Sequence, residues 1–121
     1  MILMTIKEAA GLLDAEILCG EDLLDREINS ACGSDMMSDV LAFVKEHSIL
    51  LTGLLNPQVV RTAEMMDMSC IVFVRGKHPG DAILKLAGDC GIVVMRTEYR
   101  MFSACGKLYA AGLCPEASAK V

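Results

Sequence analysis

Tryptophan is absent from the 121 residues, and only three phenylalanines and two tyrosines are present. The core must therefore be built from aliphatic side chains and from the nine methionines. A hydrophobic fraction of 54% excludes a disordered chain. Chains stay disordered when they have too little apolar surface to bury, so that burial cannot offset the entropy lost on folding. A chain of this length is expected to form one domain whose core needs neither disulfides nor a metal.

Basic charge is also scarce. Eleven Lys and Arg residues against sixteen Asp and Glu residues leave a formal net charge of −5. This balance argues against a nucleic-acid partner, which needs a basic surface, and nothing in it favours a membrane. The apolar N-terminus is broken by Lys7 and Glu8, so it is not typical of a signal peptide. The longest apolar runs, such as 49–55, are too short to span a bilayer. We expect a cytoplasmic protein.

Sequence motifs of common enzymes are missing. Neither phosphate-loop pattern, G-x-x-x-x-G-K-[ST] or G-x-G-x-x-G, occurs. The nucleophile elbow G-x-S-x-G and the zinc motif H-E-x-x-H are also absent. With only two histidines in the chain, a histidine-rich metal site cannot form. The sequence therefore predicts no enzyme, no metal site and no cofactor.

The six cysteines form no C-x-x-C pair, and without an export signal a disulfide framework is not expected. Buried thiols pack as small hydrophobic groups, so we expect structural packing for them. Cys32, near the end of a predicted strand, is the one thiol placed for nucleophilic chemistry. The cysteines are Cys19, Cys32, Cys70, Cys90, Cys105 and Cys114.

Hydrophobic periodicity predicts strands that alternate with helices. Thr5 and Glu8 form a T-x-x-E capping box, and Asn56-Pro57 predicts a second helix start. Strands are expected at 15–19, 27–32, 48–51, 70–74 and 92–95, and helices at 5–14, 34–46, 57–67, 79–88 and 97–111.

This order predicts an α/β fold: a single layered domain with a mainly parallel sheet of βα units and helices on both faces. The first two strands are expected to pair as an N-terminal β-hairpin. The domain is expected to cover residues 1–113, and residues 114–121 to form a short frayed tail.

Four loops follow predicted strands, where ligands of open parallel sheets bind. They combine small residues with hydroxyl, amide and basic groups, and helix N-termini favour anions. The same residue types are also ordinary in caps and turns. The anion-site interpretation predicts that Arg75, Lys77 and Arg96 converge on one pocket. The candidate ligand-binding residues are Ser34, Asp35, Thr52, Gly53, Asn56, Arg75, Gly76, Lys77, His78, Arg96 and Thr97.

Histidines and methionines have two interpretations each. His47 is expected at a helix C-terminus, where a cation suits the dipole. His78 is expected to be a solvated turn residue, with proton transfer as the alternative. The methionines are expected to fill the core, or else to form an apolar surface where two copies meet. A mean hydropathy of +0.46 favours a homodimer.

The order of segments resembles the DRTGG domain over about residues 4–113. Where the family name spells Thr-Gly-Gly after Asp-Arg, this chain has Glu27-Ile28-Asn29. The residues that carry the resemblance are Thr5–Leu13, Asp25-Arg26, Ser34-Asp35, Ser38–Leu41, Thr52-Gly53, Asn56–Ala63, Cys70–Val72, Gly76 and Pro79.

The resemblance implies a fold like the N-terminal domain of HPr kinase/phosphorylase and the accessory domain of CBS-containing pyrophosphatases. In such settings the domain is regulatory or dimer-forming. We therefore expect a non-catalytic regulatory module, a homodimer that binds a small anionic metabolite or nucleotide at the carboxyl ends of the strands. The alternative is a dimerisation or docking subunit for a partner enzyme, metabolic or redox, with no small-molecule ligand.

Overall fold

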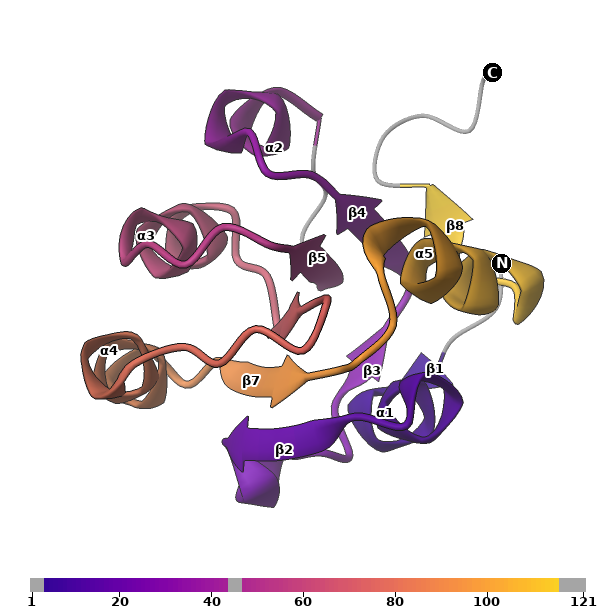
Figure 1. Cartoon of the computed structure of the whole chain (residues 1–121), viewed down its shortest axis with the longest axis horizontal. Helices are drawn as coiled ribbons and strands as arrows, with labels where there is room; N and C mark the ends of the chain where they lie inside the picture. The colour runs from indigo at the N-terminus through magenta and orange to yellow at the C-terminus, as the bar shows by residue number, and fades with distance from the viewer. Residues whose placement is uncertain (1–3, 44–46, 116–121) are drawn as a thin grey trace.

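The structure is a computed structural model that describes residues 4–43 and 47–115. Within these residues a six-stranded sheet runs in the order β2-β7-β6-β5-β4-β8 (Figure 1). Its strands are β2 (Glu16–Cys19), β4 (Ser30–Gly33), β5 (Ser48–Thr52), β6 (Cys70–Phe73), β7 (Val93–Arg96) and β8 (Cys114–Pro115). The helices are α1 (Ile6–Leu13), α2 (Met37–Phe43), α3 (Gln58–Met65), α4 (Asp81–Cys90) and α5 (Met101–Ala110).

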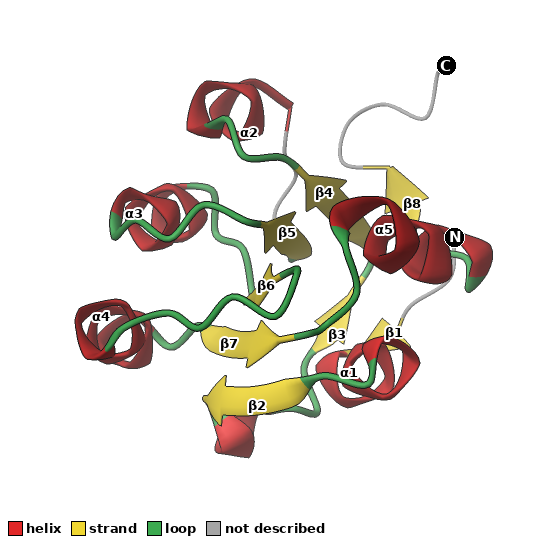
Figure 2. Ribbon diagram, in the orientation of Figure 1, coloured by secondary structure: helices red, strands yellow, loops and turns green. Residues whose placement is uncertain are grey.

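The sheet is parallel except at one edge, where β2 runs antiparallel to β7. From β4 to β7 each strand lies beside the next one in the chain, and α2, α3 and α4 cover one face. Helix α5 leads back across the sheet from β7 to β8 and covers the other face with α1 (Figure 2). The connections from β4 to β7 step across the sheet in one direction, and the connection through α5 steps back in the other. Because crossovers between parallel strands are right-handed, the helix of the returning connection lies on the opposite face. The predicted α/β fold with helices on both faces is confirmed.

Alternating side chains of the central strands feed two separate cores. In β5, Ile49 and Leu51 pack toward α1 and α5, whereas Leu50 packs toward α2, α3 and α4. All three side chains are fully buried. Successive residues of a strand point to opposite faces, so a continuous apolar run is what a sheet covered on both sides requires.

The first helix begins at the predicted capping box. The backbone N–H of Glu8 donates to Thr5 Oγ1 at 3.1 Å, and the Thr5 N–H donates to Glu8 Oε1 at 2.9 Å. The reciprocal bonds satisfy two amides that the first turn leaves without intrahelical partners. Ile6, Ala9 and Leu13 then bury one stripe of α1 against α5.

The predicted N-terminal β-hairpin is wrong. Strand β2 pairs with β7 at one edge, whereas β4 pairs in parallel with β5 and β8 near the other edge. The predicted strand 27–32 is divided at Asn29, and β3 (Glu27–Ile28) joins a separate two-stranded sheet with β1 (Met4–Thr5). The connection between β2 and β3 contains a 3₁₀ turn, η1 (Glu21–Leu23), rather than a hairpin turn. An alternating pattern identifies a strand but not its partner.

Two boundaries also differ from the expectations. The last helix begins at Met101 rather than at Thr97, because the buried Thr97 donates its hydroxyl to the Leu13 carbonyl at 2.6 Å. Strand β8 occupies the first two residues of the predicted tail. Residues 116–121, and residues 44–46 of the predicted second helix, lie outside the described residues.

Candidate functional site

Three loops at the carboxyl ends of β4, β5 and β6 meet at Gly53. Asp35 Oδ1 accepts hydrogen bonds from Thr52 Oγ1 at 3.0 Å and from the Gly53 N–H at 2.6 Å. Lys77 Nζ donates to the Gly53 carbonyl at 2.9 Å. A methyl group placed on Gly53 would lie 3.1 Å from Arg75 Nη2. Five of the predicted site residues are thus brought together, and we call them the Gly53 junction.

Arg75 approaches this junction with a left-handed backbone, at φ 62°. This conformation is uncommon for a residue with a Cβ and is found most often where the surroundings impose it. Here the Arg75 N–H donates to the Tyr99 carbonyl at 2.8 Å, and the next amide, Gly76, donates to the Thr97 carbonyl at 2.8 Å. The crevice between the diverging loops after β6 and β7, a common ligand position in such sheets, is therefore bridged by the chain itself.

Arg96 makes its own ion pairs instead of joining the junction. Its guanidinium contacts Glu16 Oε1 and Glu98 Oε2, each at 2.8 Å. Its Nε also donates to the Gly76 carbonyl at 3.2 Å. Two carboxylates balance this one cation, so the structure does not add its charge to those of Arg75 and Lys77.

The remaining predicted site residues have local partners. Ser34 Oγ accepts from the Met36 N–H at 3.0 Å, and Asn56 Oδ1 accepts from the Gln58 N–H at 2.8 Å. His78 Nδ1 lies 3.0 Å from the Pro79 carbonyl oxygen. These bonds, with that of Thr97 to α1, are the ordinary turn and cap contacts that the alternative interpretation described.

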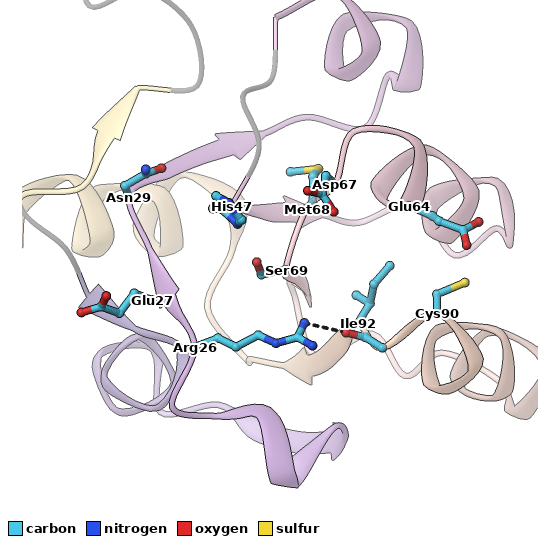
Figure 3. Close-up of a pocket in the computed structure, with 11 residues that line it drawn as sticks. Arg26, Glu27, Asn29, His47, Glu64, Asp67, Met68, Ser69, Cys90 and Ile92 are labelled. Carbon is cyan, nitrogen blue, oxygen red and sulfur yellow. Dashed lines mark hydrogen bonds between the residues drawn. The ribbon is translucent and has the colours of Figure 1, made fainter.

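A pocket of about 640 Å³ lies at the opposite end of the sheet, where the parallel strands begin (Figure 3). Its lining comes from the segments just before β4, β5, β6 and β7 and from the ends of α3 and α4. Met68, Ser69 and Ile92 are buried, whereas the charged side chains around them are exposed. The lining residues are Arg26, Glu27, Asn29, His47, Glu64, Asp67, Met68, Ser69, Cys90, Gly91 and Ile92. We call this the amino-edge pocket.

Arg26 ties one wall of the amino-edge pocket to another. Its Nη1 donates to the Gly91 carbonyl at 2.8 Å, across the space between β3 and the end of α4 (Figure 3). His47 adopts φ 59°, and its N–H donates to the Asp67 carbonyl at 3.1 Å. Partial burial, with a smaller contribution from Glu64, raises the pKa of the Cys90 thiol, so this cysteine is not an activated nucleophile.

The sequence offered little to reveal this pocket. The rule that ligands bind beyond the carboxyl ends of strands predicts a site at the other edge of the sheet. The sequence marks Asp25-Arg26 only as part of the family motif. The pocket residues come from four separate stretches of the chain, at 26–29, 47, 64–69 and 90–92, and no local spacing connects them. His47 does lie just after the predicted second helix, although residues 44–46 are not described.

Over residues 4–43 and 47–115, no group of three or more His, Cys, Asp or Glu side chains is arranged to hold a metal ion. No helix in the same ranges is both long and apolar enough to cross a membrane.

The fold defines a small α/β domain whose mainly parallel sheet is covered by helices on both faces. Residues 8–111 match the family model of the DRTGG domain, and the chain belongs to the DRTGG domain family, as the sequence predicted. Among solved structures, it is similar to the CBS and DRTGG domains of the regulatory region of Clostridium perfringens pyrophosphatase, complexed with the activator diadenosine tetraphosphate.

That likeness has a TM-score of 0.71 at 19% sequence identity and covers 86% of this chain. At such low identity it establishes the shared fold. The chain spans less than half of the solved regulatory chain, of which the match covers 45%. No curated protein matches the sequence.

Proposed function

We propose that the chain is a non-catalytic regulatory module, a homodimer that binds a small anionic metabolite or nucleotide at the Gly53 junction. The convergence of Arg75 and Lys77 on Gly53 carries this proposal. These two cations offer positive charge and N–H donors for a phosphate or carboxylate group. Asp35 is engaged by Thr52 and Gly53, so its role in the proposal is to hold the two loops together.

Two helix N-termini lie at the same edge of the sheet as the Gly53 junction. The N-caps of α4 and α5, Gly80 and Arg100, make no side-chain capping bond. Both helices start at the carboxyl edge of the sheet, where their positive dipole ends favour an anion. The strained backbone of Arg75 is also typical of functional positions, because packing must hold it against its own preference.

The regulatory role draws support from the pyrophosphatase. The similar solved chain is a regulatory region rather than a catalytic domain, and its activator is a nucleotide. The present chain contains none of the phosphate-loop or nucleophile motifs of common enzymes. We therefore place nucleotides first among the candidate ligands. The cytoplasmic location stays a prediction.

The proposed dimer contact is the outer face of α5. Phe102 is 90% exposed and Tyr109 is 69% exposed. Seven residues apart, they lie on one side of the helix. Between them lies Gly106, where an added Cβ would have no neighbouring atom within 4 Å, which leaves room for a second helix to approach closely. Aromatic side chains dominate interface energetics, so this face suits a second copy of the chain.

Ligand binding can be tested by thermal shift with nucleotides, dinucleotides, sugar phosphates and acyl phosphates. A ligand at about 100 times its dissociation constant should stabilise the fold by about 2.7 kcal/mol, or several degrees. Arg75→Gln and Lys77→Gln should abolish the shift, whereas the exposed controls Arg61→Gln and Lys7→Gln should keep it. A response that survives both junction variants would place the ligand elsewhere.

The dimer can be tested by sedimentation of the wild type and of Phe102→Glu. The substitution places a charge within the proposed contact, and we expect it to convert dimer to monomer while thermal stability at low concentration is preserved. Met65→Glu changes an exposed apolar side chain on α3 and is the matched control. A wild type that stays monomeric at high concentration would contradict this contact. If the protein is a dimer and no ligand shifts its melting temperature, the alternative function, a dimerisation or docking subunit for a partner enzyme, is favoured.

A further inference from the structure

We infer that the amino-edge pocket is a second binding site, selective for a small organic cation with amino groups. This site goes beyond the proposed anion site, from which the length of the sheet separates it. The volume of about 640 Å³ lies within the range of small-molecule sites, roughly 300–1,000 Å³. The buried floor of Met68, Ser69 and Ile92 offers apolar contact together with one hydroxyl.

The charge around the rim is unbalanced. Glu27, Glu64 and Asp67 supply three carboxylates, all exposed, and among the described residues of the lining Arg26 is the only Lys or Arg. The Arg26 guanidinium donates to the Gly91 carbonyl, which anchors it at one wall. The pocket therefore presents excess negative charge, which favours a cationic ligand.

Two helix ends strengthen this preference. Glu64 and Asp67 lie at the end of α3, and Cys90 and Gly91 lie at the end of α4. The C-terminal end of a helix carries partial negative charge, and cations are stabilised there. The helix termini and the carboxylates thus act in the same direction.

The distribution of the carboxylates favours an extended cation over a metal ion. In the part of the chain that the structure describes, His, Cys, Asp and Glu side chains nowhere gather into a group of three able to hold a metal. The three pocket carboxylates come from β3, from α3 and from the turn after it. A molecule with several separated amino groups can reach such spaced partners, whereas a single ion cannot.

The departure from the family motif falls in this pocket. Glu27 and Asn29 occupy positions where the family name spells Thr and the second Gly, and both line the pocket. Glu27 adds a negative charge beside the pocket, with its carboxylate directed away from the other labelled side chains (Figure 3), and Asn29 brings an amide that can donate and accept hydrogen bonds. The differences thus supply the chemistry that a cation with N–H donors requires.

Spermidine is a suitable probe, followed by calorimetry and by NMR shifts of the Ser69 and Gly91 amides. We expect saturable binding that shifts both amides, and about 3- to 30-fold weaker binding in Glu64→Gln/Asp67→Asn. Asp39→Asn/Asp81→Asn removes two exposed charges at the opposite edge and should bind as the wild type does. Glu27→Thr, which restores the family residue, should also weaken binding.

Two outcomes overturn the inference. One is that the pocket variant and the opposite-edge control weaken spermidine binding equally, because spermidine would then bind to the acidic surface without preference for the pocket. The other is absence of the amide shifts at Ser69 and Gly91 in the wild type. Arg75→Gln should leave spermidine binding unchanged, so failure of this site and failure of the anion site are separately observable. The amide spectrum of each variant reports whether it is folded.

Discussion

Gly33, at the end of β4, lies so close to α5 that even a methyl group does not fit. A Cβ at this position would be 2.5 Å from Cys105 Sγ and 3.2 Å from Met101 Sδ. Ordinary contacts between such atoms need about 3.5–4.0 Å. Gly33→Ala must therefore displace Cys105 or move the whole helix away from the sheet.

The size of the effect follows from this overlap. Inserting a methyl group into a packed contact costs about 1–3 kcal/mol. For 121 residues the unfolding entropy is about 0.25 kcal/mol per degree, so the melting temperature should fall by about 4–12 °C. The control is Gly88→Ala on α4, where nothing lies within 4 Å of the added methyl group. There the better helix former should add about 0.5–1 kcal/mol.

A double-mutant cycle separates overlap from other causes. Cys105→Ala removes the sulfur, so Gly33→Ala should cost about 1–2 kcal/mol less in that background than in the wild type. Urea denaturation of the four proteins measures the coupling free energy. Strict additivity of the two single changes would falsify the steric explanation.

Two further predictions concern buried groups. Thr62 Oγ1 is buried and has no hydrogen-bond partner among the described residues, so Thr62→Val should raise the free energy of unfolding by about 1 kcal/mol, measured by urea denaturation; a loss of that size would mean that the hydroxyl is satisfied. Burial, followed by the nearby Cys19, raises the pKa of the Cys70 thiol. The contribution of the protonated Cys70 thiol to the free energy of unfolding is therefore complete below the pKa of an unfolded cysteine, about 8.5. Above that pH it declines by about 1.4 kcal/mol per pH unit, because the unfolded chain loses the proton and the folded chain keeps it. Cys70→Val should be less sensitive to alkaline pH in melting experiments between pH 7.5 and about 10, and equal slopes would contradict this assignment.

Much of the fold was accessible to sequence reasoning because the signals are local. The capping box of Thr5 and Glu8, the apolar runs of β5 and β6, and the helical spacing in α3 each depend on neighbouring residues. Partner choice is different. Strand β2 lies against β7, more than seventy residues further along the chain, and no feature of residues 16–19 specifies that pairing.

The candidate site shows the same division. Which loops follow strands could be predicted, and Asp35, Gly53 and Lys77 do meet. The pairing of Arg96 with Glu16 could not be predicted, because the β2–β7 pairing brings these two residues together. The amino-edge pocket depends on four distant stretches of the chain at once, and it exists because four strands begin in register.

The two outer strands also determine how this protein can associate. Strand β8 ends the sheet on one side, and Pro115 offers no backbone N–H for a further strand. On the other side, the register of β2 shifts between Ile17 and Cys19, which interrupts a regular hydrogen-bonding edge. Edge-to-edge growth of the sheet, the usual route to β-aggregation, is thereby discouraged at both ends. A chain with 54% hydrophobic residues can then expose an apolar helix to a partner with less danger of forming fibrils.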